Sequence, residues 1–286
     1  MSAKPPPRAF HGLALDQGSL GFHLDFECYL AASAAGGFTH VEAPLGPLHE
    51  AVSPEALIRL LARFQLSIGT FTYPWDGAVN GAVSDDVWSA RRAALPRLFA
   101  FARAAGATRV SGFFNTMAPG MSALSPGELA ERLANLNAIA RDAGVVFCAE
   151  LNTVALLNTA PEILDWLGRD GDSIRLLVDA FHLYRFGLGP NWVARLRSGA
   201  IGWVHVADAP KRGLAMLDPH NRLDPGDGEI DLDALLKAVA ANSYRGPISI
   251  EVPRPSLDGT VSHDVALRLG NAGRSLLGPA LADPDA

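Results

Sequence analysis

The sequence predicts an α/β protein, specifically a single (β/α)8 TIM barrel with eight parallel strands. Short runs rich in β-branched and aromatic residues alternate with longer amphipathic runs along the chain. Several short runs, such as residues 145–147 and 176–178, are apolar throughout, which is typical of strands buried on both faces of a parallel sheet. Eight such units fit within the 286 residues, and one barrel typically needs about 250. We therefore expect one domain over residues 1–286, with residues 1–8 as a flexible terminus.

The expected strands are residues 9–15, 38–43, 66–71, 108–114, 145–150, 174–179, 201–206 and 247–252. No glycine fingerprint follows the first of them, which disfavours a dinucleotide-binding sheet. Ser53, Pro54 and Glu55 mark a helix start, because serine caps, proline suits the first helical position and an acid suits the first turn. Ser125 and Pro126 begin another helix in the same way. The remaining expected helices are residues 87–105, 232–241 and 261–277.

Composition and charge narrow the class of protein. Hydrophobic residues make up 49% of the chain, which excludes a disordered chain. A net charge of −6 disfavours nucleic acid or an anionic membrane as partner, since both are bound through basic surfaces. The N-terminus has no signal-peptide pattern, and no apolar run is long enough to span a membrane. With only two cysteines, we expect a cytoplasmic protein, and the sequence leaves open whether it forms a homo-oligomer.

Residues of metal-ligand type end four consecutive expected strands. These residues are Glu150, Asp179, His205 and Glu251, spaced by about one βα unit each except for one enlarged loop. In a barrel the carboxyl ends of the strands converge on the active site. Each acid alone could equally be a helix cap or a surface residue. Together, three carboxylates are costly to bury without a cation, so we predict one divalent ion there, Mn²⁺, Mg²⁺, Co²⁺ or Zn²⁺.

Two sequence motifs lie in the same half of the chain. Asp-x-x-His covers Asp179 to His182, and Arg-x-x-Pro-Gly-x-Gly covers Arg222 to Gly228. With the segments FTHVEAP and ISIEVPRP, they resemble the xylose-isomerase-like barrels, a superfamily of sugar isomerases and epimerases. Within it, residues 13–275 are most similar to the inosose (2-keto-myo-inositol) isomerases.

The resemblance implies roles for individual residues. It makes Glu150, Asp179, His205 and Glu251 the metal ligands. It makes His182 a substrate-binding or supporting group, and it makes Arg222 a residue that binds substrate or closes the metal site. Ketose 3-epimerases carry a further acid soon after the fifth-strand glutamate, whereas residues 151–158 contain none, which argues against that subfamily.

Two further residues are candidates for contact with substrate. Glu42 ends the second strand and could face the mouth or pair with a neighbouring strand. Asn152 lies on the same pleat face as Glu150 and could bind a hydroxyl or cap a helix. His11, Trp75 and Phe113 are expected on the pocket wall.

The expected reaction moves a carbonyl through a cis-enediolate, with Glu150 and Glu251 taking and returning the carbon-bound proton. The expected substrate is a polyol ketone or ketose, because acids at positions 218, 224, 227 and 229 surround a single Arg222 and would repel a phosphate. Other isomerases, including a hydroxypyruvate isomerase type, a 3-dehydroshikimate dehydratase-type lyase, an endonuclease and a non-enzymatic binding module remain as alternatives. The endonuclease would need more ligands and a basic groove.

Overall fold

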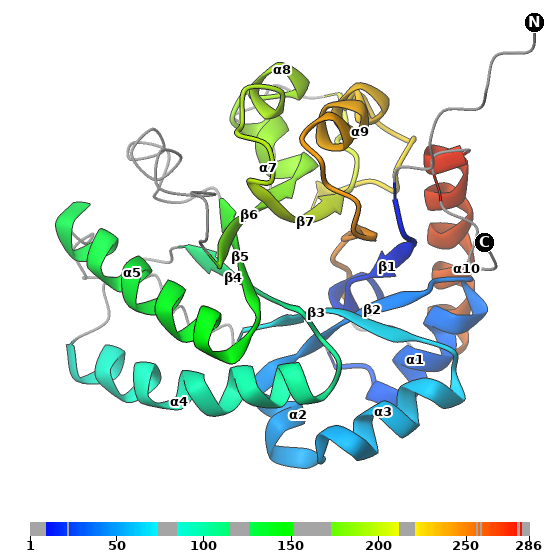
Figure 1. Cartoon of the computed structure of the whole chain (residues 1–286). Coiled ribbons are helices and arrows are strands. Elements are labelled where there is room, and N and C mark those ends of the chain that lie inside the picture. Colours follow the sequence, from blue (N-terminus) through cyan, green and yellow to red (C-terminus); the bar gives the residue numbers. More distant parts are fainter. Residues whose placement is uncertain are drawn as a thin grey trace, which may run out of the picture.

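The computed structural model describes residues 10–21, 23–73, 85–114, 126–151, 173–211, 221–255, 257, 259–278 and 281. Eight strands form a closed barrel in chain order, and every neighbouring pair is parallel (Figure 1). The predicted (β/α)8 TIM barrel is confirmed. Among the described residues, no helix combines the length and the apolar character that a membrane crossing requires.

The strands are β1 (Leu13–Leu15), β2 (His40–Pro44), β3 (Ser67–Thr72), β4 (Arg109–Phe114), β5 (Val146–Leu151), β6 (Ile174–Asp179), β7 (Ile201–Val206) and β8 (Ile248–Ile250). The helices are η1 (Gln17–Leu20), α1 (Phe26–Ala35), α2 (Leu45–Ala51), α3 (Pro54–Arg63), α4 (Asp85–Ala104), α5 (Pro126–Ala143), α7 (Ala180–Arg185), α8 (Pro190–Val193), α9 (Leu232–Ala241) and α10 (Gly259–Leu277).

The structure departs from the expected elements at the first and last strands and in the short helices. β1 begins only at Leu13, because Gly12 has a φ of 144°, outside the β region. β8 ends at Ile250, so Glu251 follows the strand directly. The helices α2, α7 and α8 have 7, 6 and 4 residues, which is too short to show a helical period in the sequence.

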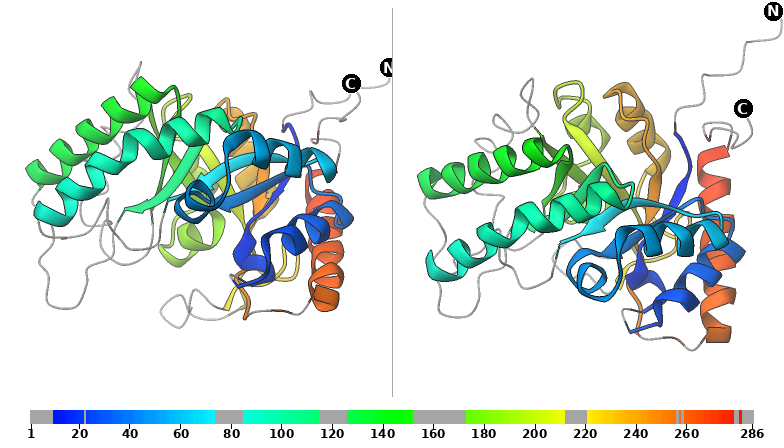
Figure 2. Two further views of the ribbon diagram at one scale, coloured as in Figure 1. Left: turned by 90° about the horizontal axis from the view of Figure 1, so that it is seen from below. Right: turned by 60° about the horizontal axis from the view of Figure 1, so that its bottom comes forward.

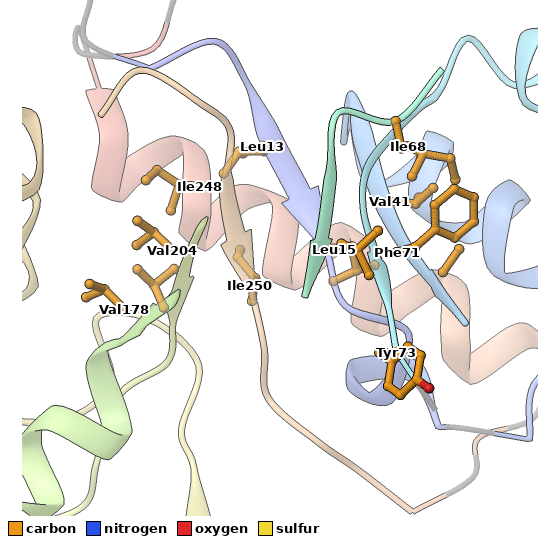
Figure 3. Packing of buried hydrophobic residues seen from close by; sticks show 14 of the residues in the cluster. Leu13, Leu15, Val41, Ile68, Phe71, Tyr73, Val178, Val204, Ile248 and Ile250 are labelled. Atoms are coloured by element: carbon orange, nitrogen blue, oxygen red, sulfur yellow. The ribbon is translucent and has the colours of Figure 1, made fainter. Parts of the chain in front are cut away.

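The main core lies between the barrel and its helices. Leu13 and Leu15 of β1 lie beside Ile248 and Ile250 of β8, all of them buried (Figure 3). Burial of such apolar surface is the main force that holds helices against a barrel. Helices α4 and α5 lie side by side on one flank, and α1 and α10 pack together on another (Figure 2). This layer fixes the direction of each strand and hence the positions of the side chains at its end.

A second, smaller core fills the barrel interior beneath the mouth. It centres on Trp203, which is fully buried with Cys148 and Leu177. The indole has room because the facing residue of β3 is Gly69: a Cβ there would lie 2.4 Å from Cη2 of Trp203. This interior layer is the floor of the candidate site.

Candidate active site and metal centre

Four side chains meet where β5 to β8 end: Glu150, Asp179, His205 and Glu251. One ligand atom from each lies within 4.8 Å of the others. Nδ1 of His205 lies 3.2 Å from Oε2 of Glu251, 3.8 Å from Oε1 of Glu150 and 3.9 Å from Oδ2 of Asp179. The structure therefore brings together all four residues that the sequence predicts as ligands. Their binding of a metal stays a prediction.

Unsatisfied polar atoms test whether this cluster suits a divalent ion. Oε1 of Glu150 and Nδ1 of His205 are buried and have no hydrogen-bond partner, and Oε2 of Glu251 has an ion pair with Arg222 but no hydrogen bond. Buried polar atoms without a hydrogen bond are rare, and here they share one centre. Three carboxylates and one imidazole, with no thiol among them, form a donor set suited to Mn²⁺, Mg²⁺, Co²⁺ or Zn²⁺ in a catalytic site. The residues present therefore fit such an ion.

Glu42 lies beneath the cluster and holds the imidazole of His205 in place. Its Oε1 accepts hydrogen bonds from Nε2 of His205 at 2.9 Å and Nε1 of Trp203 at 3.0 Å, and from Oγ of Ser249. A register shift between Val41 and Glu42 along the β2–β3 pairing brings this carboxylate to its position. Because Nε2 faces Glu42, the other ring nitrogen faces the cluster. This contact favours a positioning role for Glu42, whereas the sequence predicts a substrate contact.

Arg222 reaches into the cluster from the loop after β7. Its Nη1 lies 2.7 Å from Oδ2 of Asp179 and 2.8 Å from Oε2 of Glu251. Its Nη2 lies 3.2 Å from Nε2 of His182, and the guanidinium stacks over Phe181 with Cζ 5.0 Å from the ring centre. Nε2 of His182 is also 3.9 Å from Oε1 of Glu150. The predicted pair His182 and Arg222 therefore lies against the cluster.

Asp179 both caps a helix and faces the cluster, two roles that the sequence alone presents as alternatives. Its Oδ1 accepts hydrogen bonds from the backbone N–H groups of Phe181 and His182 and so caps α7. Its Oδ2 faces Arg222 and the cluster. The cap fixes the carboxylate, so the short helix α7 positions the second oxygen toward the centre.

The buried charges perturb one another strongly. Burial, together with nearby Glu251 and Asp179, raises the pKa of Glu150 to about 8. Burial also raises the pKa of Asp179, but Arg222, His182 and His205 outweigh it and hold that pKa well below the usual range. For His205, the carboxylates of Glu42 and Glu251 outweigh burial and raise its pKa. Such opposed shifts among neighbouring groups are typical of functional sites.

A cavity of about 350 Å³ opens beside the cluster. It is lined by Asp16, Gln17, Glu42, Pro44, Pro47, Thr72, Tyr73, Ser111, Gly112, Glu150, Leu177, His205 and Glu251. Asp16 is absent from the sequence prediction, although it follows β1 directly, as Glu251 follows β8. The position after a strand is the signal that could have found it.

Four predictions for the site have other outcomes. Asn152 and Trp75 fall outside the described residues, and so does the side chain of Phe113. His11 was expected on the pocket wall, and this is wrong. It is exposed and precedes β1, at the opposite end of the strand from the cavity.

In the acidic loop after β7, the structure pairs Asp224 with arginines, and Asp218 falls outside the described residues. Asp224 forms ion pairs with Arg254 and Arg268, with Nε of Arg268 at 2.6 Å. Glu229 accepts a hydrogen bond from the hydroxyl of Tyr184. Repulsion of phosphate by Asp224 is therefore not supported. The groups that line the cavity decide which substrate charge the site favours.

The chain matches a family model described as "Xylose isomerase-like TIM barrel" over residues 30–270. It is 30% identical over 128 residues to an inosose isomerase of Halalkalibacterium halodurans, covering 43% of this chain and 45% of that protein. It is 36% identical over 99 residues to a 3-dehydroshikimate dehydratase of Pseudomonas aeruginosa, covering 34% of this chain and 16% of that protein. The matches thus span less than half the length of these curated relatives.

Solved structures share the fold at lower identity. The IOLI protein with a bound zinc atom is 17% identical, with a TM-score of 0.78 over 95% of this chain and 100% of the other. An L-ribulose 3-epimerase is 21% identical, with a TM-score of 0.71 over 95% of both chains. These likenesses support the barrel fold and do not identify the reaction.

Proposed function

The chain belongs to the xylose isomerase-like TIM barrel family, and from this premise we propose that it is a divalent-metal-dependent isomerase of polyol ketones, with inosose as its first candidate substrate. One observation carries the proposal. Glu150 has a buried carboxylate oxygen without a hydrogen-bond partner, and it lines a cavity beside a cluster that fits a metal ion. A base and an electrophilic centre side by side are what removal of a proton next to a carbonyl requires.

The proposed metal ligands are Glu150, Asp179, His205 and Glu251. When bound there, a divalent ion would supply Lewis-acid stabilisation of negative charge on the carbonyl oxygen and its neighbouring hydroxyl oxygen. Glu42 keeps Nδ1 of His205 directed at the cluster. Supporting contacts of this kind orient metal ligands in other proteins.

Glu150 and Glu251 are the proposed proton-transfer groups. The carboxylate of Glu150 accepts the proton from the carbon next to the carbonyl, which leaves an enediolate. Glu251 takes up a proton from solvent and gives it to the adjacent carbon, the hydroxyl proton passes between the two substrate oxygens, and Glu150 releases its proton to solvent. The carbonyl thereby moves by one position with no net change in atoms. Glu150 is the freer base, because Oε2 of Glu251 lies 2.8 Å from Arg222 and Oε1 of Glu150 has no such partner.

His182 and Arg222 are proposed to bind the reacting end of the substrate. Nδ1 of His182 is buried and has no hydrogen-bond partner. Arg222 pairs with Asp179 and Glu251, and its positive charge helps to hold the pKa of Asp179 well below the usual range. Asn152 remains a proposed substrate contact from its place one residue after β5.

The cavity wall favours a neutral substrate. The lining residues that the structure describes include hydroxyl, amide and carboxylate groups and neither lysine nor arginine. A phosphate or carboxylate tail would need positive charge there and would meet carboxylates instead. We also place the protein in the cytoplasm, since Cys28 and Cys148 are both free thiols.

Turnover of 2-keto-myo-inositol in D₂O tests the proposal. The protein is loaded with Mn²⁺, Co²⁺ or Zn²⁺, and products are analysed by NMR. We expect isomerisation with deuterium entering next to the carbonyl, since a carboxylic acid exchanges its proton with solvent. Unlabelled product would indicate a hydride shift and contradict proton transfer through glutamate. Absence of turnover with every loaded metal would refute the isomerase.

A dehydratase is the second candidate, and the match to 3-dehydroshikimate dehydratase favours it. The same base could remove a proton, after which a β-hydroxyl leaves as water. Loss of water from 3-dehydroshikimate, with a rise in ultraviolet absorbance, distinguishes this reaction from isomerisation.

A further inference from the structure

The metal cluster and the remaining cavity wall occupy opposite halves of the barrel mouth. The cluster residues end β5 to β8, whereas Asp16, Gln17, Glu42 and Thr72 come from β1 to β3 or directly after β1. In the closed barrel, β1 lies across from β5. β1 also pairs with β8, and Glu42 contacts His205, so Asp16 and Glu42 border the β7–β8 side of the cluster and face a substrate whose carbonyl is held there.

Two carboxyl groups meet at this β1–β2 side of the cavity. β1 and β2 pair in parallel with Leu15 opposite Val41, so the next residues, Asp16 and Glu42, are neighbours across the strands. Asp16 is 6% exposed and Glu42 is 1% exposed. Both line the cavity.

Each of these carboxyl groups has one oxygen already bound within the protein. Oδ1 of Asp16 accepts the backbone N–H of Gly18 at 2.8 Å, and Oε1 of Glu42 accepts three donors. Oε2 of Glu42 is buried without any hydrogen-bond partner. An acceptor left unsatisfied inside a protein is costly unless a ligand supplies a donor.

We propose that Asp16 and Oε2 of Glu42 form a subsite for two neighbouring hydroxyl groups of the substrate that lie outside its reacting pair of carbons. This inference rests on the proposed function and makes Asp16 a specificity-determining residue. Hydroxyl groups donate well to carboxyl oxygens, and two adjacent acceptors match a vicinal diol. A substrate with a carboxylate or phosphate at this position would place a negatively charged hydrogen-bond acceptor against Asp16 and Glu42. Repulsion between these groups would exclude it.

Asp16→Ser separates this role from the structural one. Serine can still cap η1 by accepting the Gly18 N–H, but it lacks the second oxygen that lines the cavity. Asp25→Ser is the matched control, because Asp25 also caps a helix, α1, and is exposed outside the cavity. Thermal melting checks that both variants fold.

Two readouts on Asp16→Ser and a series of substrate analogues test the subsite. We expect Asp16→Ser to lower kcat/KM for 2-keto-myo-inositol by about 10–100-fold, the range of a hydrogen bond to a charged group, and Asp25→Ser to leave it unchanged. Calorimetric binding of myo-inositol, which has no carbonyl, should weaken by a similar factor. With the wild-type protein, ketone analogues that lack one hydroxyl of the subsite should show the same loss in kcat/KM. The analogue that lacks the hydroxyl bound by Asp16 should have the same kcat/KM with the wild type and with Asp16→Ser.

The outcomes distinguish this subsite from the reaction itself. If the wild type isomerises the ketone and Asp16→Ser changes both readouts by less than threefold, the subsite is wrong and the isomerase stands. If the wild type turns over no ketone, the proposed function fails, and myo-inositol binding decides the subsite alone. If Asp16→Ser does not fold, the deoxy series decides: losses under threefold at every hydroxyl outside the reacting pair of carbons overturn the subsite.

Discussion

Replacing Glu42 with glutamine tests how far the orientation of His205 depends on the negative charge beneath it. Oε1 of Glu42 accepts three hydrogen bonds, from His205, Trp203 and Ser249. Burial raises the pKa of Glu42, but His205 and these hydrogen bonds lower it further, so the pKa is below its ordinary value. The charge therefore stabilises the ring with Nε2 protonated and Nδ1 facing the cluster. In glutamine the amide oxygen keeps the shape of the acceptor and loses the charge.

The expected effect is on metal affinity more than on folding. Loss of a group that orients a ligating histidine typically weakens metal binding by about 10–100-fold, equivalent to about 1.4–2.7 kcal/mol. The assay is a titration of metal-stripped protein with Zn²⁺ against a chromophoric chelator at pH 7. Glu55→Gln is the control, since Glu55 is exposed in the first turn of α3. A Glu42→Gln affinity within threefold of wild type would refute the reasoning.

Three further predictions address catalysis, packing and pH. Glu150→Gln should lower turnover by about 10²–10⁴-fold, and a variant with normal metal content and normal turnover would contradict its role as base. Gly69→Ala places a Cβ 2.4 Å from Trp203, so urea unfolding should show a loss of about 1–3 kcal/mol, whereas unchanged stability would contradict the close packing. Burial, then Arg109, lowers the pKa of His40 to about 4. The unfolded chain takes up this proton near pH 6.5 and the folded protein near pH 4. Stability should therefore fall by up to about 3 kcal/mol as pH drops through this window, and less in His40→Gln.

The strand ends were the most informative part of the sequence. Buried parallel strands are apolar throughout, so the first acid or histidine at the end of each, such as Glu150 or Asp179, stands out. Barrel topology then places these ends together without any knowledge of loops. The first acid or histidine at the end of each strand thus predicts the cluster of four side chains. The same pattern at the first strand identifies Asp16.

Contacts between distant strands were beyond the sequence. The position of Glu42 depends on donors in β7 and β8, more than 150 residues away, and on a register shift that no local pattern encodes. The ion pairs of Asp224 likewise come from Arg254 and Arg268, outside its own loop. The charges counted along a loop therefore do not give the electrostatic potential around it, because arginines from other segments pair with Asp224.

The division of the barrel mouth has a consequence for how this scaffold diversifies. The proton-transfer groups and candidate ligands end β5 to β8, whereas the remaining wall of the cavity comes from β1 to β4 and the residues just after them. Apart from Glu42, which positions His205, residues of the N-terminal half can therefore vary and alter which molecules fit without contacting the metal-ligand candidates. Conversely, substitutions at the ends of β5 to β8 can change the acid–base groups while the cavity residues of β1 to β4 stay the same. Exchange of β1–β4 loop segments between relatives is thus a route to new specificity that keeps the metal centre intact.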